Sequence, residues 1–193
     1  TRSFVAALPA HERTAVLERA ADDALARMRA RRLDALGQGL LAIEKRRLVA
    51  IAADWLQFEI DQRAEFEVKA IEDRRALAIG PLSLNGRLDR VDRLADGRTI
   101  VIDYKTGAKG GVRSWLGARP DEPQLPLYLV ASEPDARAVA FARVRAGDKA
   151  FVALAEEEGL LPKASVDWKS EHASWPALVD AWSDAALRVN KDA

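Results

Sequence analysis

The sequence predicts an α/β protein of the α+β kind, in which helices flank a mixed central sheet and a helical extension comes first. Three observations support this fold class. Apolar residues recur at helical spacing through residues 10–35 and 40–62. Short runs of alternating apolar and charged residues between 65 and 107 predict antiparallel strands. A Ser-Trp-Pro sequence at 174–176 predicts the start of a final helix.

The helical extension is predicted to cover residues 1–62 and to pack on a core formed by residues 63–193. A chain of 193 residues fits one domain with such an extension. Trp55 lies on the apolar side of the second helix, so we expect it in the core rather than as a platform for stacked bases.

A meander of three antiparallel strands is predicted after the helices. The first strand covers residues 65–72, and a Gly-Pro turn at 80–81 precedes the second. An Asp-Gly pair at 96–97 then joins the second strand to the third, which is a strong hairpin signal. One face of this meander is apolar and the other is polar.

The length of the hairpin loop decides where Asp89 points. Side chains alternate between the faces of a strand, so Asp103 and Lys105 share one face. A two-residue loop would turn Asp89 away from Asp103. A three-residue loop, with Gly97 in the left-handed position, would place Asp89 opposite Asp103 with Cβ atoms roughly 5 Å apart. The sequence leaves both arrangements open.

Two carboxylates on one face predict a metal site. Facing carboxylates repel each other, and a cation between them would offset that repulsion. Two carboxylates, water and a substrate phosphate are ligands that Mg²⁺ prefers, and Lys105 could hold a water or a phosphate oxygen. We therefore interpret the hairpin as a metal site for phosphate-ester chemistry. The alternative is the ordinary charged face of an exposed hairpin.

The remaining elements complete the predicted core. A short helix at 121–132 would carry Gln124 and Tyr128 on one side, because they are four residues apart. Strands at 138–144 and 150–155 are predicted to form a second hairpin, with arginines alternating near its turn.

Positive charge gathers around the proposed site although the net charge of the chain is zero. Residues 85–119 hold eight basic and four acidic side chains. The third strand is followed by a basic, glycine-rich loop that contains Lys109. Such a loop could close over a strand of nucleic acid, or it could be an irregular connection.

Three motifs resemble the PD-(D/E)XK nuclease superfamily, and in particular its RecB-like branch. They are Gly-Arg-Leu-Asp-Arg-Val-Asp at 86–92, Ile-Asp-Tyr-Lys-Thr-Gly at 102–107 and Gln-Leu-Pro-Leu-Tyr at 124–128. The last of these matches the Gln-x-x-x-Tyr motif of that branch. The resemblance covers roughly residues 60–190 and implies a restriction-endonuclease-like core.

The resemblance also implies a function, a metal-dependent DNA nuclease that serves as the exonuclease domain of a recombination-repair helicase–nuclease. Asp89 and Asp103 would ligate Mg²⁺, with Mn²⁺ as a possible substitute, and Lys105 would position or deprotonate the attacking water. The implied partners are DNA and the helicase domains or subunits of a repair complex. The supporting DNA contacts would come from Gln124, Tyr128, Arg87 and Lys109.

One departure from the family pattern concerns a further metal ligand. RecB-like nucleases usually carry a His or Glu on a helix before the first strand, in a Gly-x-x-x-His context. Here Gly37 is followed by Leu41 where that His would stand, and His11 has no such glycine. The ligand could lie upstream of Thr1, it could be Glu44 in altered spacing, or it could be absent. Its absence would favour a weakly active or inactive DNA-binding or scaffold module of the same fold.

Composition excludes several kinds of site. The chain has no cysteine, which rules out disulfides, a thiolate nucleophile, a cysteine-ligated zinc site and an iron–sulfur cluster. No run approaches 18 apolar residues and no secretory signal is visible, so we expect a cytoplasmic protein without a membrane partner. Because the chain begins mid-pattern and without Met, we also expect it to be a fragment of a longer protein.

Overall fold

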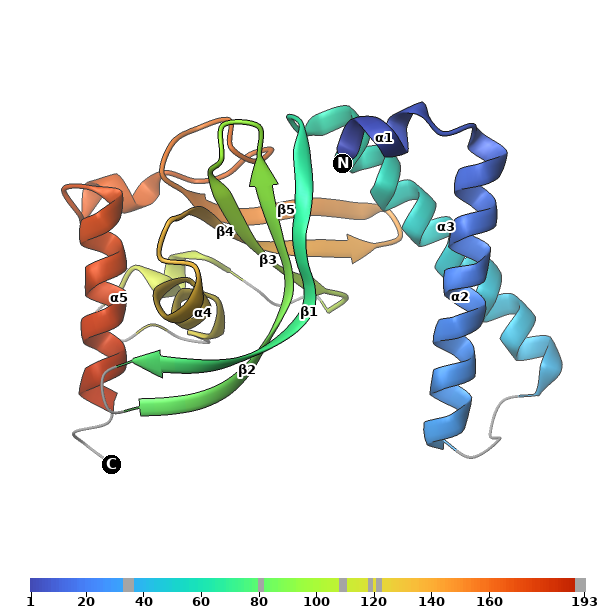
Figure 1. Cartoon of the computed structure of the whole chain (residues 1–193), viewed down its shortest axis with the longest axis horizontal. Helices are drawn as coiled ribbons and strands as arrows, with labels where there is room; N and C mark the ends of the chain where they lie inside the picture. Colours follow the sequence, from blue (N-terminus) through green and yellow to red (C-terminus); the bar gives the residue numbers. More distant parts are fainter. Residues whose placement is uncertain (33–36, 80–81, 108–110, 118–119, 121–122, 190–193) are drawn as a thin grey trace.

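The computed structural model describes residues 1–32, 37–79, 82–107, 111–117, 120 and 123–189. In these residues, three helices precede a five-stranded sheet, and two further helices follow its third and fifth strands (Figure 1). The elements are α1 Arg2–Ala7, α2 Ala10–Arg32, α3 Gln38–Gln62, β1 Phe66–Ile79, β2 Leu82–Leu94, β3 Thr99–Lys105, a 3-10 turn Arg113–Trp115, α4 Gln124–Ser132, β4 Ala136–Arg145, β5 Asp148–Ala155, a 3-10 turn Asp167–Ser170 and α5 Trp175–Val189.

The sheet is mixed, with strand order β1-β2-β3-β4-β5. Neighbouring strands are antiparallel except β3 and β4, which run parallel and are joined through α4. A parallel pair needs a crossover connection, and α4 supplies its helix. The predicted α+β class, the three-stranded meander and the second hairpin are confirmed.

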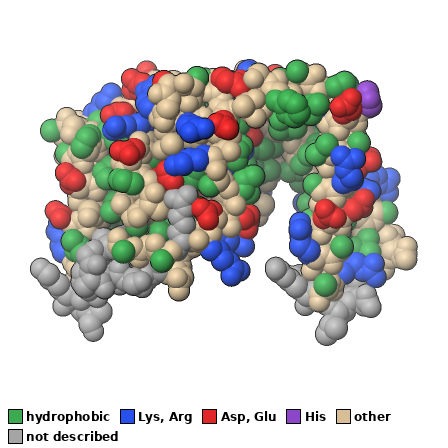
Figure 2. All heavy atoms as spheres, in the orientation of Figure 1, with side chains coloured by type: hydrophobic (Ala, Val, Ile, Leu, Met, Phe, Trp, Pro, Cys, Tyr) green, Lys and Arg blue, Asp and Glu red, His purple; other side chains and the backbone are tan. Residues whose placement is uncertain are grey.

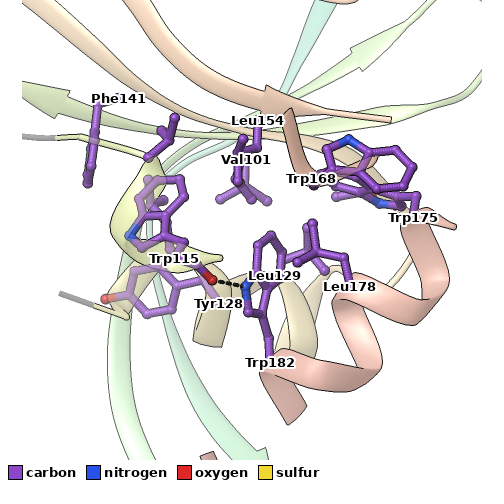
Figure 3. Packing of buried hydrophobic residues seen from close by; sticks show 14 of the residues in the cluster. Val101, Trp115, Tyr128, Leu129, Phe141, Leu154, Trp168, Trp175, Leu178 and Trp182 are labelled. Atoms are coloured by element: carbon purple, nitrogen blue, oxygen red, sulfur yellow. Dashed lines mark hydrogen bonds between the residues drawn. The ribbon is translucent and has the colours of Figure 1, made fainter. Parts of the chain in front are cut away.

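Two apolar clusters cover the two faces of the sheet. The α4–α5 cluster holds Trp115, Leu129, Leu178 and Trp182 against one face (Figure 3). The α3 cluster holds Trp55 on the other face, with Ile100 and Ile102 of β3 and the first residue of β1, Phe66. Strand β3 shows the expected alternation, because Val101 belongs to the first cluster while its two neighbours belong to the second.

The N-terminal helices pack on one another, and the later part of α3 reaches the sheet. Trp55 of α3 is buried, with its ring centroid 5.1 Å from that of Phe151 on β5. Helix α2 stands away from the sheet, and a hollow separates it from the body of the molecule (Figures 1 and 2). Within the residues that the structure covers, no helix combines the length and the apolar character needed to span a bilayer.

Strand β1 continues seven residues beyond the predicted end, to Ile79, because β2 pairs with it along the whole length. The ribbon of two strands turns over at Glu72, which has a left-handed φ of 51°. Ala70 and Leu77 both face the α4–α5 cluster. They are seven residues apart, and residues at an odd separation point to opposite faces of a regular strand. The turned ribbon then curves beneath α4 (Figure 1).

Other predicted boundaries differ slightly or fall outside the described residues. The first long helix is described to Arg32, and residues 33–36 lie outside the described part. The predicted Gly-Pro turn at 80–81 also lies outside it. The helix predicted from residue 121 begins at Gln124, and residues 121–122 are not among those described.

Candidate active site

The loop between β2 and β3 has three residues. The Leu94 N–H donates to the Arg98 carbonyl at 2.8 Å, and Gly97 has a φ of +90°. The paired residues run from Arg93 opposite Thr99 to Arg90 opposite Ile102. One further step of this register places Asp89 opposite Asp103. The three-residue alternative is therefore confirmed, and the two acids lie on the same face of the sheet.

Asp89, Asp103 and Lys105 meet where β2 leaves β3. The carboxylate of Asp89 accepts the backbone N–H of Tyr104 at 3.0 Å. The Lys105 ammonium lies 2.8 Å from the carboxylate of Asp103. Asp103 is only 6% exposed, whereas the Lys105 side chain is 31% exposed. A buried acid thus sits beside a second acid and beneath a cation that reaches solvent.

The surroundings of Asp103 oppose its ionisation. Burial raises the pKa of Asp103, and the charge of Asp89 raises it further. The Lys105 ammonium acts in the other direction, but it does not cancel the rise in the pKa. Such a shift, caused by desolvation and a specific like charge, is typical of functional sites.

Aromatic rings support the site from within the sheet. Phe141 stands beside Asp103 on the neighbouring strand β4, and the Lys105 ammonium lies 5.0 Å from its ring centroid. The Phe141 ring in turn packs on Trp115, 4.9 Å away between centroids (Figure 3). Trp115 is fully buried, so its ring is not open to a stacking base.

Gln124 and Tyr128 contact the strand that carries Asp89. The Tyr128 hydroxyl accepts the backbone N–H of Arg87 at 3.0 Å and the side-chain amide of Gln124, also at 3.0 Å. Arg87 lies two residues before Asp89, so this contact fixes β2 just before the site. The Tyr128 ring packs against Gly86, where a Cβ would clash with the ring and lie 2.7 Å from Leu77.

Substituting Gly86 with alanine should therefore destabilise the protein. The new methyl group must displace Tyr128 or Leu77, and overpacking of this kind costs about 1–3 kcal/mol. Denaturant unfolding measures the change. Gly39→Ala is the matched control, because no heavy atom lies within 4 Å of its Cβ and the site is inside helix α3. Equal stability of the Gly86 variant and the wild type would contradict the role assigned to this close contact.

The Arg87 side chain forms an ion pair with Glu72. Its guanidinium lies 2.9 Å from the Glu72 carboxylate, and both side chains are more than half exposed. Glu72 stands on β1 between the residues that pair with Arg90 and Leu88, so it lies across the ribbon from Asp89. The left-handed φ of Glu72 is uncommon outside glycine and marks the bend at the edge of the site.

A buried charge network stands behind the site, on the opposite face of the sheet. Asp92 accepts hydrogen bonds from Arg63 at 2.7 Å and from Arg90 at 2.7 and 2.9 Å. Glu59 of α3 accepts from the same two arginines at 2.7 and 3.1 Å. Arg90 also donates to the Tyr104 hydroxyl at 2.7 Å. Arg90 follows Asp89 on β2, and Tyr104 follows Asp103 on β3. Because Arg90 contacts both Tyr104 and Glu59, the network connects α3 to both strands of the site.

The structure does not bring the other suggested ligands together with Asp89 and Asp103. Glu44 pairs with Arg47 at 2.8 Å on α3, 11 residues or about 16 Å along the helix before Trp55. His11 is exposed on α2. Lys109, predicted to contact DNA, lies outside the described residues. Among the residues that are described, no three His, Cys, Asp or Glu side chains gather in a way that could hold a metal ion.

The residues that are present nevertheless suit a divalent cation. Asp103 is a buried acid whose neighbour is a second acid, and a cation would relieve both its desolvation and that repulsion. Carboxylate oxygens are the ligands that Mg²⁺ takes, with water in its remaining positions. Asp89 and Asp103 are the residues that could hold such an ion, and the Tyr104 carbonyl could add an oxygen.

Sequence reasoning missed several residues of this region. Glu59, Arg63 and Arg90 were not recognised as members of a buried network, since their partners come from separate elements. Glu72 was expected in an ordinary strand position. The one sequence signal for the network is the second acid of the Gly-Arg-Leu-Asp-Arg-Val-Asp motif, Asp92, which is fully buried.

Comparison with known proteins adds two findings. A family model described as the PD-(D/E)XK nuclease superfamily matches residues 2–188. The chain is also 36% identical over 76 residues to the B subunit of the ATP-dependent helicase/deoxyribonuclease of Streptococcus agalactiae serotypes Ia, V and III. These matches cover 38% of the chain and 7% of each relative, so the chain spans a small part of their length.

A solved structure is a more distant match. It is the crystal structure of a protein named SSO0001, which is 14% identical and has a TM-score of 0.29. The match covers 72% of this chain and 57% of the other. At this TM-score the similarity carries no argument about function.

Proposed function

Because the chain belongs to the PD-(D/E)XK nuclease superfamily, we propose that it hydrolyses DNA phosphodiester bonds with the help of a divalent metal ion. The observation that carries the proposal is the convergence of Asp89, Asp103 and Lys105 on one face of the sheet, where β2 leaves β3. The local match to a helicase/deoxyribonuclease subunit supports DNA as the substrate. It also supports helicase domains or subunits as partners. Within such a complex we propose that the chain is the exonuclease domain and serves recombination and repair.

Each residue of the site has a part in the proposed reaction. Asp89 and Asp103 would hold Mg²⁺, for which Mn²⁺ could substitute. When bound, the ion would activate water and neutralise charge at the phosphate. Lys105, anchored to Asp103 yet open to solvent, places its ammonium where it can orient the attacking water or stabilise the developing negative charge. Tyr128 and Gln124 hold the backbone at Arg87, and with it the strand that carries Asp89.

The central test is cleavage of single- and double-stranded DNA in Mg²⁺ and in chelator, by the wild type and by Lys105→Met. We expect Mg²⁺-dependent cleavage by the wild type, and about a 10²–10³-fold slower rate for the variant, because a positioned charge at the reacting phosphate is lost. Lys149→Met is the matched control, since Lys149 also pairs with an aspartate, Asp54, away from the site. Cleavage by Lys105→Met at the wild-type rate would overturn the role of this lysine.

A second candidate is a catalytically weak or inactive DNA-binding module of the same fold in a repair complex. It is favoured because, among the described residues, no three His, Cys, Asp or Glu side chains cluster in a way that could hold a metal ion. DNA binding without cleavage in Mg²⁺ or Mn²⁺ would support this candidate over the first. Mg²⁺-dependent cleavage that Lys105→Met abolishes would exclude it.

A further inference from the structure

A second cation lies beside Lys105 at the ends of the parallel strands. Lys105 is paired with Arg143 of β4. This pair lies two residues further along both strands than the pair of Asp103 and Phe141. Paired residues of adjacent strands lie about 4.8 Å apart and project to the same face. The site face therefore carries two rows, an acidic row that ends at Phe141 and a basic row formed by Lys105 and Arg143.

The charge of Arg143 is weakly compensated, and one of its hydrogen-bond donors is unpaired among the described residues. Its side chain is 30% exposed, and its guanidinium lies 3.7 Å from the carboxylate of Asp148, which is 44% exposed. Its Nε–H is buried and has no hydrogen-bond partner among the residues that the structure describes. Leaving a buried donor unpaired is unfavourable, and an arginine presents five donors. Lys105, by contrast, is held 2.8 Å from Asp103.

We propose that Arg143 binds a backbone phosphate of the nucleic acid next to the phosphate that is cleaved. This inference rests on the proposed nuclease function and adds a DNA contact to it. The Lys105 ammonium is held 2.8 Å from the carboxylate of Asp103, whereas the carboxylate nearest to Arg143 in an ion pair is 3.7 Å away and 44% exposed. Arg143 is therefore the less engaged of the two cations. The planar guanidinium of an arginine fits a phosphate through two parallel hydrogen bonds, and the Arg143 side chain is 30% exposed.

The test compares Arg143→Gln with Arg137→Gln in DNA binding and in cleavage. Arg137 lies on the same strand six residues earlier, about 20 Å away, and its side chain is 32% exposed with a carboxylate 3.5 Å away. Binding is measured with Ca²⁺ in place of Mg²⁺, over a range of salt concentrations. Thermal unfolding checks the fold, and Arg143→Lys provides a second variant that keeps the charge but not the paired donors.

We expect Arg143→Gln to weaken DNA binding about tenfold and to reduce the slope of log affinity against log salt by about one. Arg143→Lys should keep the slope and recover part of the affinity, and Arg137→Gln should behave as the wild type. Equal affinities and slopes for Arg143→Gln and Arg137→Gln, with a wild type that binds and cleaves DNA, would overturn this inference alone. A wild type that neither binds nor cleaves DNA would overturn the proposed function as well.

Discussion

Asp103→Asn should slow DNA cleavage about 10²–10³-fold while DNA binding is largely kept. Asparagine preserves the shape of the side chain but removes the charge on which both the metal and Lys105 depend. The rate is measured under single-turnover conditions in Mg²⁺, and binding is measured separately in Ca²⁺. Binding should survive because removing a negative charge also removes repulsion of the phosphates. Cleavage at the wild-type rate would refute the assignment of this acid to the reaction.

The same substitution should change stability with pH in a defined direction. The pKa of Asp103 is raised in the folded protein, so this group stabilises the fold below the ordinary pKa of aspartate and loses that contribution as pH rises through the raised pKa. Above that raised pKa the ionised side chain therefore lowers the free energy of unfolding relative to a neutral one. Asp103→Asn, neutral at every pH, should melt at a higher temperature than the wild type at pH 7 in chelator.

Measurements at lower pH provide a control for the expected gain in melting temperature. The advantage of the Asp103 variant should shrink as pH falls toward the ordinary aspartate pKa, where the wild-type group is protonated too. Asp54→Asn, at an ion pair with Lys149 on the surface, should show no gain at pH 7. A lower melting temperature for Asp103→Asn at pH 7 would mean that the ion pair with Lys105 outweighs burial, and the expected direction would then be wrong.

Asp92→Ala should cost about 3–5 kcal/mol of stability, because it leaves two buried arginines without their shared carboxylate. Asp92 is fully buried and accepts hydrogen bonds from Arg63 and Arg90, which are 5% and 7% exposed. Domains commonly have about 5–15 kcal/mol in total. The substitution therefore removes a large part of the stability. Urea or guanidinium unfolding gives the measurement.

The control for Asp92 is a solvent-facing ion pair that joins β1 and β2. Glu67 of β1 lies 2.7 Å from Arg93 of β2, and each side chain is 52% exposed. Glu67→Ala should change the free energy of unfolding by less than about 1 kcal/mol, since solvent screens such pairs. A similar loss in both variants would show that burial is not what makes the network matter.

Much of the fold could be predicted from local sequence. The helical periodicity before residue 62, the Asp-Gly turn and the two hairpins each depend on residues close together in the chain. The face shared by Asp103 and Lys105 followed from alternation alone. Whether Asp89 joined them depended on one residue of loop length. The sequence is compatible with both lengths, and the pairing of Leu94 with Arg98 decides between them.

The remainder depends on contacts between distant segments. The neighbour of Lys105 is Arg143 only because β4 lies parallel to β3, and no local pattern fixes that pairing. One partner of Asp92 is Arg63, 29 residues earlier in the chain, and the other is Arg90 of its own strand. The left-handed conformation of Glu72 is unusual for its residue type, so propensity gives no warning of the bend.

The alternation of side chains along β2 has a consequence for cells. Asp89 faces the site, and its neighbour Arg90 faces the buried network. Substitutions at adjacent positions should therefore have different effects, one on activity and the other on stability. If the proposed function holds, a change at Asp103 should leave folded, inactive protein that still binds DNA and competes with the active form. A change at Asp92 should instead yield unfolded chains that proteases clear. The Asp103 change should then act as a dominant-negative mutation, whereas the Asp92 change should act as a simple loss of function.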